Sequence, residues 1–139
     1  MIIIPITDLV YRVNPTVFIN CSLKELKKEV ERVIGEPWTD FDIEEEEKIN
    51  AYGMVFKVIN EKKDSYTILW VKEFEWNIKY LAMLVHESRH LTDEILESRG
   101  VKLTDIEATA YYNEFIYSEI LKGIKKFEDK KTKKKKKLK

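Results

Sequence analysis

The clearest hydrophobic pattern in the chain runs over residues 76–97, which contain no proline or glycine. Apolar residues recur there at intervals of three and four positions, the period of an α-helix with one buried face. Gly100 follows as a stop signal, because glycine readily adopts the left-handed conformation that ends helices. A helix is therefore predicted, and its buried side consists of Leu81, Leu84, Val85, Ser88, Leu91 and Ile95.

Two more segments have helical character. Ser22-x-x-Glu25 is a capping box that opens a helix ending before Gly35. Its apolar stripe is Leu23, Leu26, Val30 and Ile34. A third helix is predicted from Asp105 to about Gly123, after a turn of only four residues. Such a short turn makes the two flanking helices spatial neighbours.

The strands are indicated by β-branched residues between turn signals. Short strands are expected at residues 2–4, 9–13 and 17–20. Residues 51–59 and 66–72 flank a polar loop and are predicted to form a hairpin. Residues 36–50 are the least regular part. This order of elements predicts an α+β fold with an antiparallel or mixed sheet that helices cover on one face.

The charge is distributed unevenly along the chain. Its formal net charge is zero, but residues 125–139 hold ten lysines against Glu128 and Asp129, a net +8, so residues 1–124 carry −8. We expect one domain over residues 1–124 and a disordered, solvated tail. The alternative for the tail is a weak, salt-sensitive contact with nucleic acid or another polyanion between Lys130 and Lys139.

Composition also indicates a compartment. The single cysteine, Cys21, cannot form an internal disulfide, which favours a reducing environment. Residues 1–5 lack the basic start of a signal peptide, and no apolar stretch approaches the ~20 residues that span a bilayer. A cytoplasmic protein with no membrane partner is expected.

The candidate chemistry lies in the sequence His86-Glu87-Ser88-Arg89-His90, which contains both histidines of the chain. This is the H-E-x-x-H pattern, which on a helix presents two imidazoles to one zinc ion beside a carboxylate. The histidines lie opposite the apolar stripe, and this disfavours an ordinary core histidine. Two alternatives stay open: a chance match, and a solvated helix face on which His90 pairs with Asp93 or Glu94.

A zinc site requires a third protein ligand. There is no third histidine and Cys21 is far upstream, so the ligand must be a carboxylate. Glu107, in the first turn of the next helix, is the best candidate and Asp105 the reserve. The alternative is that Glu107 closes a capping box with Thr104, or that Asp105 is only a helix cap.

Residues 85–90, Gly100-Val101 and residues 107–111 together resemble the compact zincin-like metallopeptidases with a glutamate third ligand. The likeness is greatest to small zincin-like proteins of bacteriophages and prophages, and it covers roughly residues 66–121. It implies a small zincin-like fold and a cofactor, Zn²⁺. The substrate would be a peptide or protein, and the location the host cytosol if the gene is carried by a phage.

For the site, the resemblance implies zinc bound by His86, His90 and Glu107, with Glu87 as general base. Tyr111, one turn beyond Glu107, is the candidate hydrogen-bond donor to the oxyanion, or else a packing residue.

The neighbouring residues have expected roles as well. Residues 66–72 would be either an edge strand that pairs with an extended peptide or an interior strand. Asp93 and Glu97 could orient the histidine rings or form exposed ion pairs, and Arg89 is either a substrate clamp or, as we favour, a surface residue. The rival interpretation is a non-catalytic assembly or interaction protein that binds zinc, or one associated with nucleic acid through its basic tail.

Overall fold

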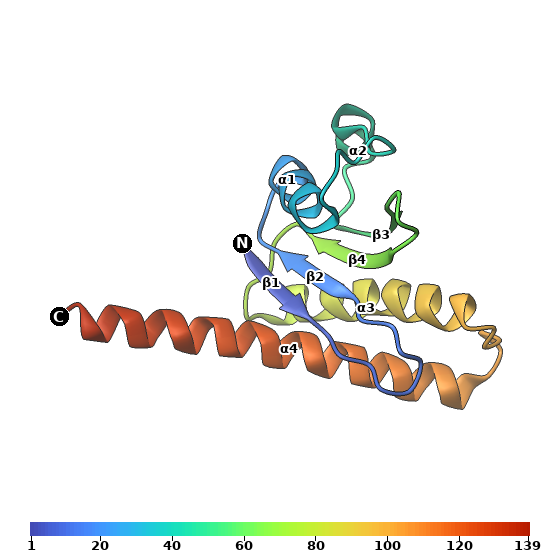
Figure 1. The fold of residues 1–139 in the computed structure, drawn as a ribbon. Coiled ribbons are helices and arrows are strands. Elements are labelled where there is room, and N and C mark those ends of the chain that lie inside the picture. Colours follow the sequence, from blue (N-terminus) through green and yellow to red (C-terminus); the bar gives the residue numbers. More distant parts are fainter.

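A computed structural model describes all of residues 1–139. Its four strands form one mixed sheet in the order β1-β2-β4-β3 (Figure 1). β1 (Ile2–Pro5) pairs antiparallel with β2 (Thr16–Ile19), and β2 runs parallel to β4 (Ser65–Val71). β3 (Gly53–Ile59) pairs antiparallel with β4, which confirms the predicted hairpin.

The edge strand next to the predicted metal helix is β3, whereas β4 lies inside the sheet between β2 and β3. Of the two alternatives left open for residues 66–72, the interior position is the correct one. The sequence Ile68-Leu69-Trp70-Val71 is fully buried, and such an unbroken apolar run is typical of a strand covered on both faces.

Helices cover both faces of the sheet, so the prediction of one covered face is wrong. α1 (Leu23–Ile34) and α2 (Ile43–Ile49) lie on one side, and α3 (Ile78–Ser98) and α4 (Ile106–Lys137) lie side by side on the other (Figure 1). Side chains of β2 and β4 alternate between two cores. The core under α1 contains Phe18, Ile68 and Trp70, and the core against α3 and α4 contains Val17, Ile19, Leu69 and Val71.

Local capping explains where the first two helices begin. Ser22 Oγ accepts a hydrogen bond from the Glu25 amide (3.1 Å), and α1 ends at Gly35 with φ +75°. Asp42 caps α2 by accepting from the amides of Glu44 (3.0 Å) and Glu45 (3.3 Å). The segment 36–50, expected to be irregular, therefore contains a short helix whose acidic first turn suits the positive end of the helix dipole.

Residues 9–13, predicted as a strand, form a loop instead. The Asp8 carboxylate turns the chain, because its Oδ1 accepts from the amides of Val10 (2.8 Å) and Tyr11 (3.2 Å). Its Oδ2 accepts from the Tyr112 hydroxyl of α4 at 2.7 Å. Both Asp8 and Tyr112 are buried, so the loop is held to α4 by one enclosed polar contact.

Replacing Tyr112 by phenylalanine should lower the free energy of unfolding by about 1–3 kcal/mol, the usual cost of leaving a buried polar group without its partner. Burial, and then the hydrogen bond to Asp8, raise the pKa of Tyr112 above its ordinary value of 10.0. The stabilisation is therefore complete below pH 10 and declines as the pH rises further. Urea denaturation at pH 7 and pH 11 measures it. Tyr111→Phe, at an exposed hydroxyl, is the control, and an equal loss in the two variants would contradict the assignment.

α4 does not end at Gly123, and the tail predicted to be disordered continues it to Lys137. A Cβ at Gly123 would lie 2.5 Å from Cγ2 of Ile4, so this glycine lets α4 approach β1 closely rather than ending the helix. Every side chain from Lys125 onward is exposed, and the C-terminal end of the helix projects from the body (Figure 1). None of the helices combines the length and apolar character that a membrane crossing requires.

Candidate metal centre

His86 and His90 lie one turn apart on α3 with their Nε2 atoms 3.0 Å from each other. The ring centroids are 4.6 Å apart and the rings are nearly perpendicular, at 85°. Two nitrogens bound to one tetrahedral zinc ion at its usual bond length lie roughly 3.4 Å apart. The pair therefore needs only a small side-chain adjustment to bind one metal ion, and both rings are exposed to solvent.

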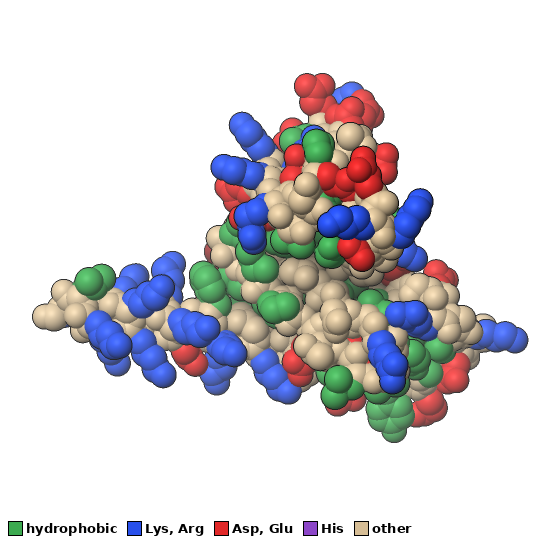
Figure 2. Space-filling view, viewed as in Figure 1, with side chains coloured by type: hydrophobic (Ala, Val, Ile, Leu, Met, Phe, Trp, Pro, Cys, Tyr) green, Lys and Arg blue, Asp and Glu red, His purple; other side chains and the backbone are tan.

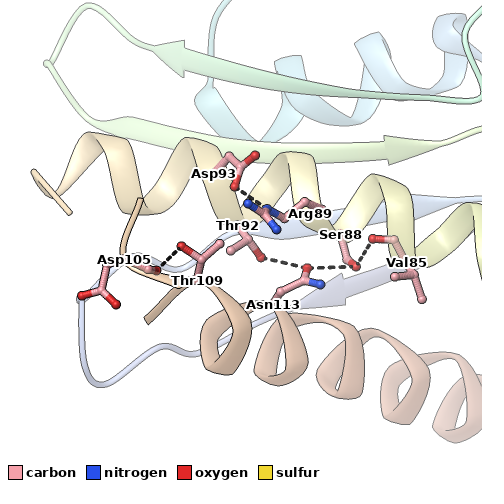
Figure 3. Close-up of polar contacts among 8 residues, drawn as sticks. All are labelled: Val85, Ser88, Arg89, Thr92, Asp93, Asp105, Thr109 and Asn113. Atoms are coloured by element: carbon pink, nitrogen blue, oxygen red, sulfur yellow. Dashed lines mark hydrogen bonds and ion pairs between the residues drawn. The ribbon is translucent and has the colours of Figure 1, made fainter. Parts of the chain in front are cut away.

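The histidines point away from α4. Ser88, midway between them, is fully buried and faces α4: its Oγ donates to the Val85 carbonyl of its own helix at 2.8 Å and lies 3.4 Å from Asn113 Oδ1 of α4. Thr92 Oγ1 donates to the same oxygen at 3.2 Å, as Figure 3 shows. Residues two positions apart on a helix face opposite directions. The side of α3 that contacts α4 is thus fixed by Ser88, and the two imidazoles lie on the other side.

Glu87 occupies the space between the histidines and the sheet. It is only 6% exposed, and its Oε2 has no hydrogen-bond partner. Burial raises the pKa of Glu87, and the neighbouring charges of His90 and His86 act in the opposite direction. Buried carboxylates are normally hydrogen-bonded, so an unpartnered one calls for an explanation. A carboxyl group with a raised pKa next to two imidazoles is suited to proton transfer.

Gly53, the first residue of β3, makes room for this carboxyl group. A Cβ at position 53 would lie 2.5 Å from Oε2 and 2.6 Å from Cδ of Glu87. Gly53 lies outside the sequence motif at residues 86–90. Its signal is a glycine at the start of a strand pattern, which often marks a close approach to the backbone.

Two neighbouring tyrosine side chains, Tyr52 and Tyr80, lie beside Glu87. The rings of Tyr52 and Tyr80 lie 6.2 Å apart, and each hydroxyl donates to Glu73: Tyr52 to its carbonyl and Tyr80 to its carboxylate at 2.8 Å. Burial, then the charges of Tyr80 and Glu87, raise the pKa of Tyr52 above its ordinary value. Tyr52 is therefore a neutral hydrogen-bond donor near Glu87, and no sequence motif points to it.

Glu107 is not brought together with the histidines. It is exposed in the first turn of α4, and no three His, Cys, Asp or Glu side chains form a group that could hold a metal ion. The short turn after α3 makes the two helices neighbours, as predicted, but through the face of α3 opposite His86 and His90. Thr104 is not the cap of α4: Asp105 caps it, accepting from the Ala108 amide at 3.0 Å.

Tyr111, the predicted oxyanion donor, also lies elsewhere. It is 68% exposed and lines a groove with Leu9 and Val10 of the loop before β2. It precedes Asn113 by two residues, so it points away from α3 when Asn113 points toward it. In this arrangement Tyr111 faces the groove beside the loop and not the histidine side of α3.

The charged residues around the motif form a surface pair. Arg89 Nε donates to Asp93 Oδ1 at 2.7 Å on the exposed side of α3 (Figure 3). Arg89 is thus a surface residue, as expected, and Asp93 bonds to it rather than to a histidine ring. Exposed pairs of this type contribute little to stability.

Gly53→Ala should lower the free energy of unfolding by about 1–3 kcal/mol, the typical cost of overpacking an interior. The same substitution in a Glu87→Ala background should cost clearly less, since the carboxyl group that the new Cβ meets is gone. Denaturant unfolding of the four proteins measures this coupling. Lys57→Ala, on the exposed side of the same strand, is the control. Equal costs in both backgrounds would show that Gly53 does not accommodate Glu87.

Comparison with known proteins identifies no relatives: no family model matches the chain, and no curated protein or solved structure matches it either. The class that the structure defines is a small α+β domain with a four-stranded mixed sheet and four helices. Any function is therefore argued from the site alone.

Proposed function

We propose that this protein is a zinc-dependent metallopeptidase in which Glu87 acts as the general base. One observation carries the proposal. The buried carboxylate of Glu87, whose Oε2 has no hydrogen-bond partner, lies between the edge strand β3 and the two imidazole nitrogens, which are 3.0 Å apart. On a helix surface that served only for solubility, an acidic side chain would be expected to stay in water, because burying a carboxylate without a partner costs free energy.

The residues present fit a zinc ion in part. His86 and His90 supply two nitrogen donors at a suitable separation, and Gly53 leaves space for the carboxyl group beside them. When bound, zinc would polarise a water molecule and the carbonyl oxygen of a peptide. The third protein ligand is not in position. Glu107, predicted from the sequence as that ligand, could serve only if the first turn of α4 reached the opposite side of α3, so this arrangement predicts zinc binding through the two histidines without Glu107.

Glu87 would accept a proton from the attacking water and return it to the nitrogen of the leaving amine. Burial raises the pKa of Glu87, which moves the carboxyl group toward the range in which a general base both takes and returns a proton.

The free edge of β3 supports a peptide as the substrate. β3 is the outer strand of the sheet and begins at Gly53, against Glu87. An extended peptide could add to such an edge through backbone hydrogen bonds. Its scissile bond would then lie along the edge that passes the carboxyl group.

A second candidate function is favoured by the exposure of the histidine pair and by the absence of a third ligand. A structural zinc site takes four protein ligands. Two copies of this chain, each contributing His86 and His90, would supply four imidazoles. Such a zinc-bridged assembly would have no need of Glu87, and this separates it from the hydrolase.

The test uses full-length protein purified without a histidine tag. Elemental analysis should find about one zinc per chain, and a peptide-library screen should detect cleavage that stops on chelation and returns with zinc. Half a zinc per chain, no cleavage and a zinc-dependent dimer in sedimentation would overturn the hydrolase in favour of the assembly. Protein that binds no zinc at micromolar concentrations would exclude both.

A further inference from the structure

The C-terminal part of α4 is a cationic arm, defined here as residues 125–139. It projects from the body as a helix to Lys137 (Figure 1), and lysine side chains follow its length in Figure 2. The arm carries a net +8 and the rest of the chain −8. A polyanion would therefore be attracted by the arm and repelled by the body.

The base of the arm is fixed to the body. Trp76 Nε1 donates to the carboxylate of Glu128 at 2.9 and 2.8 Å, joining the segment before α3 to the first turn of the arm. The ten lysines thus extend from a fixed point rather than from a loose linker.

Lysines surround the arm on all sides. Residues 133–137 are five consecutive lysines, and at about 100° per residue they cover the whole circumference of a helix. Only Phe127 and Leu138 are apolar, so the arm has no apolar face of the kind that places a helix in a membrane surface. A flat anionic surface would also leave half of these charges unpaired.

A groove with phosphates on both walls matches this distribution. The major groove of B-form DNA is about 12 Å wide and admits an α-helix, whereas the major groove of A-form RNA is too narrow. The thirteen residues from 125 to 137 extend for roughly 20 Å at 1.5 Å per residue, a length of duplex that carries about twelve phosphates. The arm contains no Arg, Asn or Gln, the side chains that read bases most often, so sequence preference is not expected.

We propose that the arm binds double-stranded DNA without sequence preference by entering the major groove, where its lysines contact phosphates of both strands. The binding is independent of the proposed zinc chemistry. Like charges at i and i+4 along the arm repel one another in the free protein, and the phosphates remove that repulsion.

Fluorescence anisotropy of the full chain with a labelled 20-base-pair duplex tests the proposal, between 50 and 200 mM salt. Replacing the five lysines of residues 133–137 by glutamine should weaken binding at least tenfold at the lowest salt and reduce the slope of log K against log salt by up to about 4. The matched control replaces five exposed body lysines by glutamine, and it should bind as the wild type does. These are Lys24, Lys28, Lys57, Lys62 and Lys63.

A second pair of variants tests the helical shape without changing the charge. Thr132→Pro interrupts the arm and should lower affinity for the duplex severalfold, whereas Thr132→Ala should not. Equal binding by Thr132→Pro and wild type would overturn insertion into the groove. So would equal affinity for a 20-base-pair RNA duplex or for anionic phosphatidylserine vesicles, and unchanged binding after the five lysine substitutions would remove the arm as the contact.

Discussion

The His86→Ala and His90→Ala variants are each expected to lose stoichiometric zinc binding. The fold places the two Nε2 atoms 3.0 Å apart, and neither imidazole can hold the ion alone. The loss should exceed the roughly 10–100-fold that follows from removing a mere hydrogen-bond partner of a ligand. Competition with a chromogenic chelator measures the affinity, and elemental analysis measures the zinc content.

The decisive companion variant is Glu107→Gln. Glu107 is exposed at the start of α4, on the side of α3 opposite the histidines, so zinc affinity should stay within the error of the wild type. Glu97, exposed on α3, forms no side-chain hydrogen bond to either imidazole, contrary to one of its predicted roles, and Glu97→Gln is therefore the control for loss of one negative charge. If Glu107→Gln lost zinc to the same extent as His86→Ala, the first turn of α4 would have to move to the metal. The ligand set predicted from the sequence, with Glu107 as the third ligand, would then be correct.

The histidine pair could be predicted because its geometry is local. Four residues separate His86 from His90, and any α-helix places such residues on one side. The same holds for the ends of α1, where Ser22 and Gly35 act within one turn of their own positions. These features depend on backbone hydrogen bonds that neighbouring residues determine, and neighbouring residues are what a sequence pattern shows.

The predictions from sequence are wrong where tertiary contacts, rather than local preferences, determine the backbone conformation. Residues 9–13 have the composition of a strand, but Asp8 holds that segment as a loop through the buried hydroxyl of Tyr112, more than a hundred residues away. Gly123 has the form of a helix stop, but the side chain of Ile4 is packed against it and α4 continues. In both cases a long-range partner overrides the local preference.

In the candidate site, too, the local features could be predicted from the sequence and the tertiary contacts could not. A short turn predicted that α3 and α4 are neighbours, and they are, but turn length does not determine which face of each helix meets the other. Ser88, Thr92 and Asn113 determine that face, and they direct Glu107 and Tyr111 away from the histidines. The contact between Gly53 and Glu87 joins a strand to a helix more than thirty positions later, so only the fold could reveal it.

The Glu87→Gln variant should retain zinc and lose peptide hydrolysis by about 10²–10⁴-fold, the usual contribution of a general base. Glutamine has nearly the same shape and fits the same space under Gly53, but it cannot accept the proton. The effect should appear in kcat, with KM nearly unchanged, because the amide removes a transition-state interaction and leaves the β3 edge intact. Steady-state kinetics on a peptide from the cleavage screen measures both constants.

Glu97→Gln serves as the matched control, since it removes a carboxylate from an exposed position on the same helix and should hydrolyse the peptide at the wild-type rate. Hydrolysis at the wild-type rate by Glu87→Gln would exclude Glu87 as the base. A zinc-dependent dimer that forms equally in wild type and Glu87→Gln, with no cleavage by either, would favour the assembly function. Because the substitution leaves both imidazoles in place, zinc content and catalysis are tested separately, and each proposal can fail without the other.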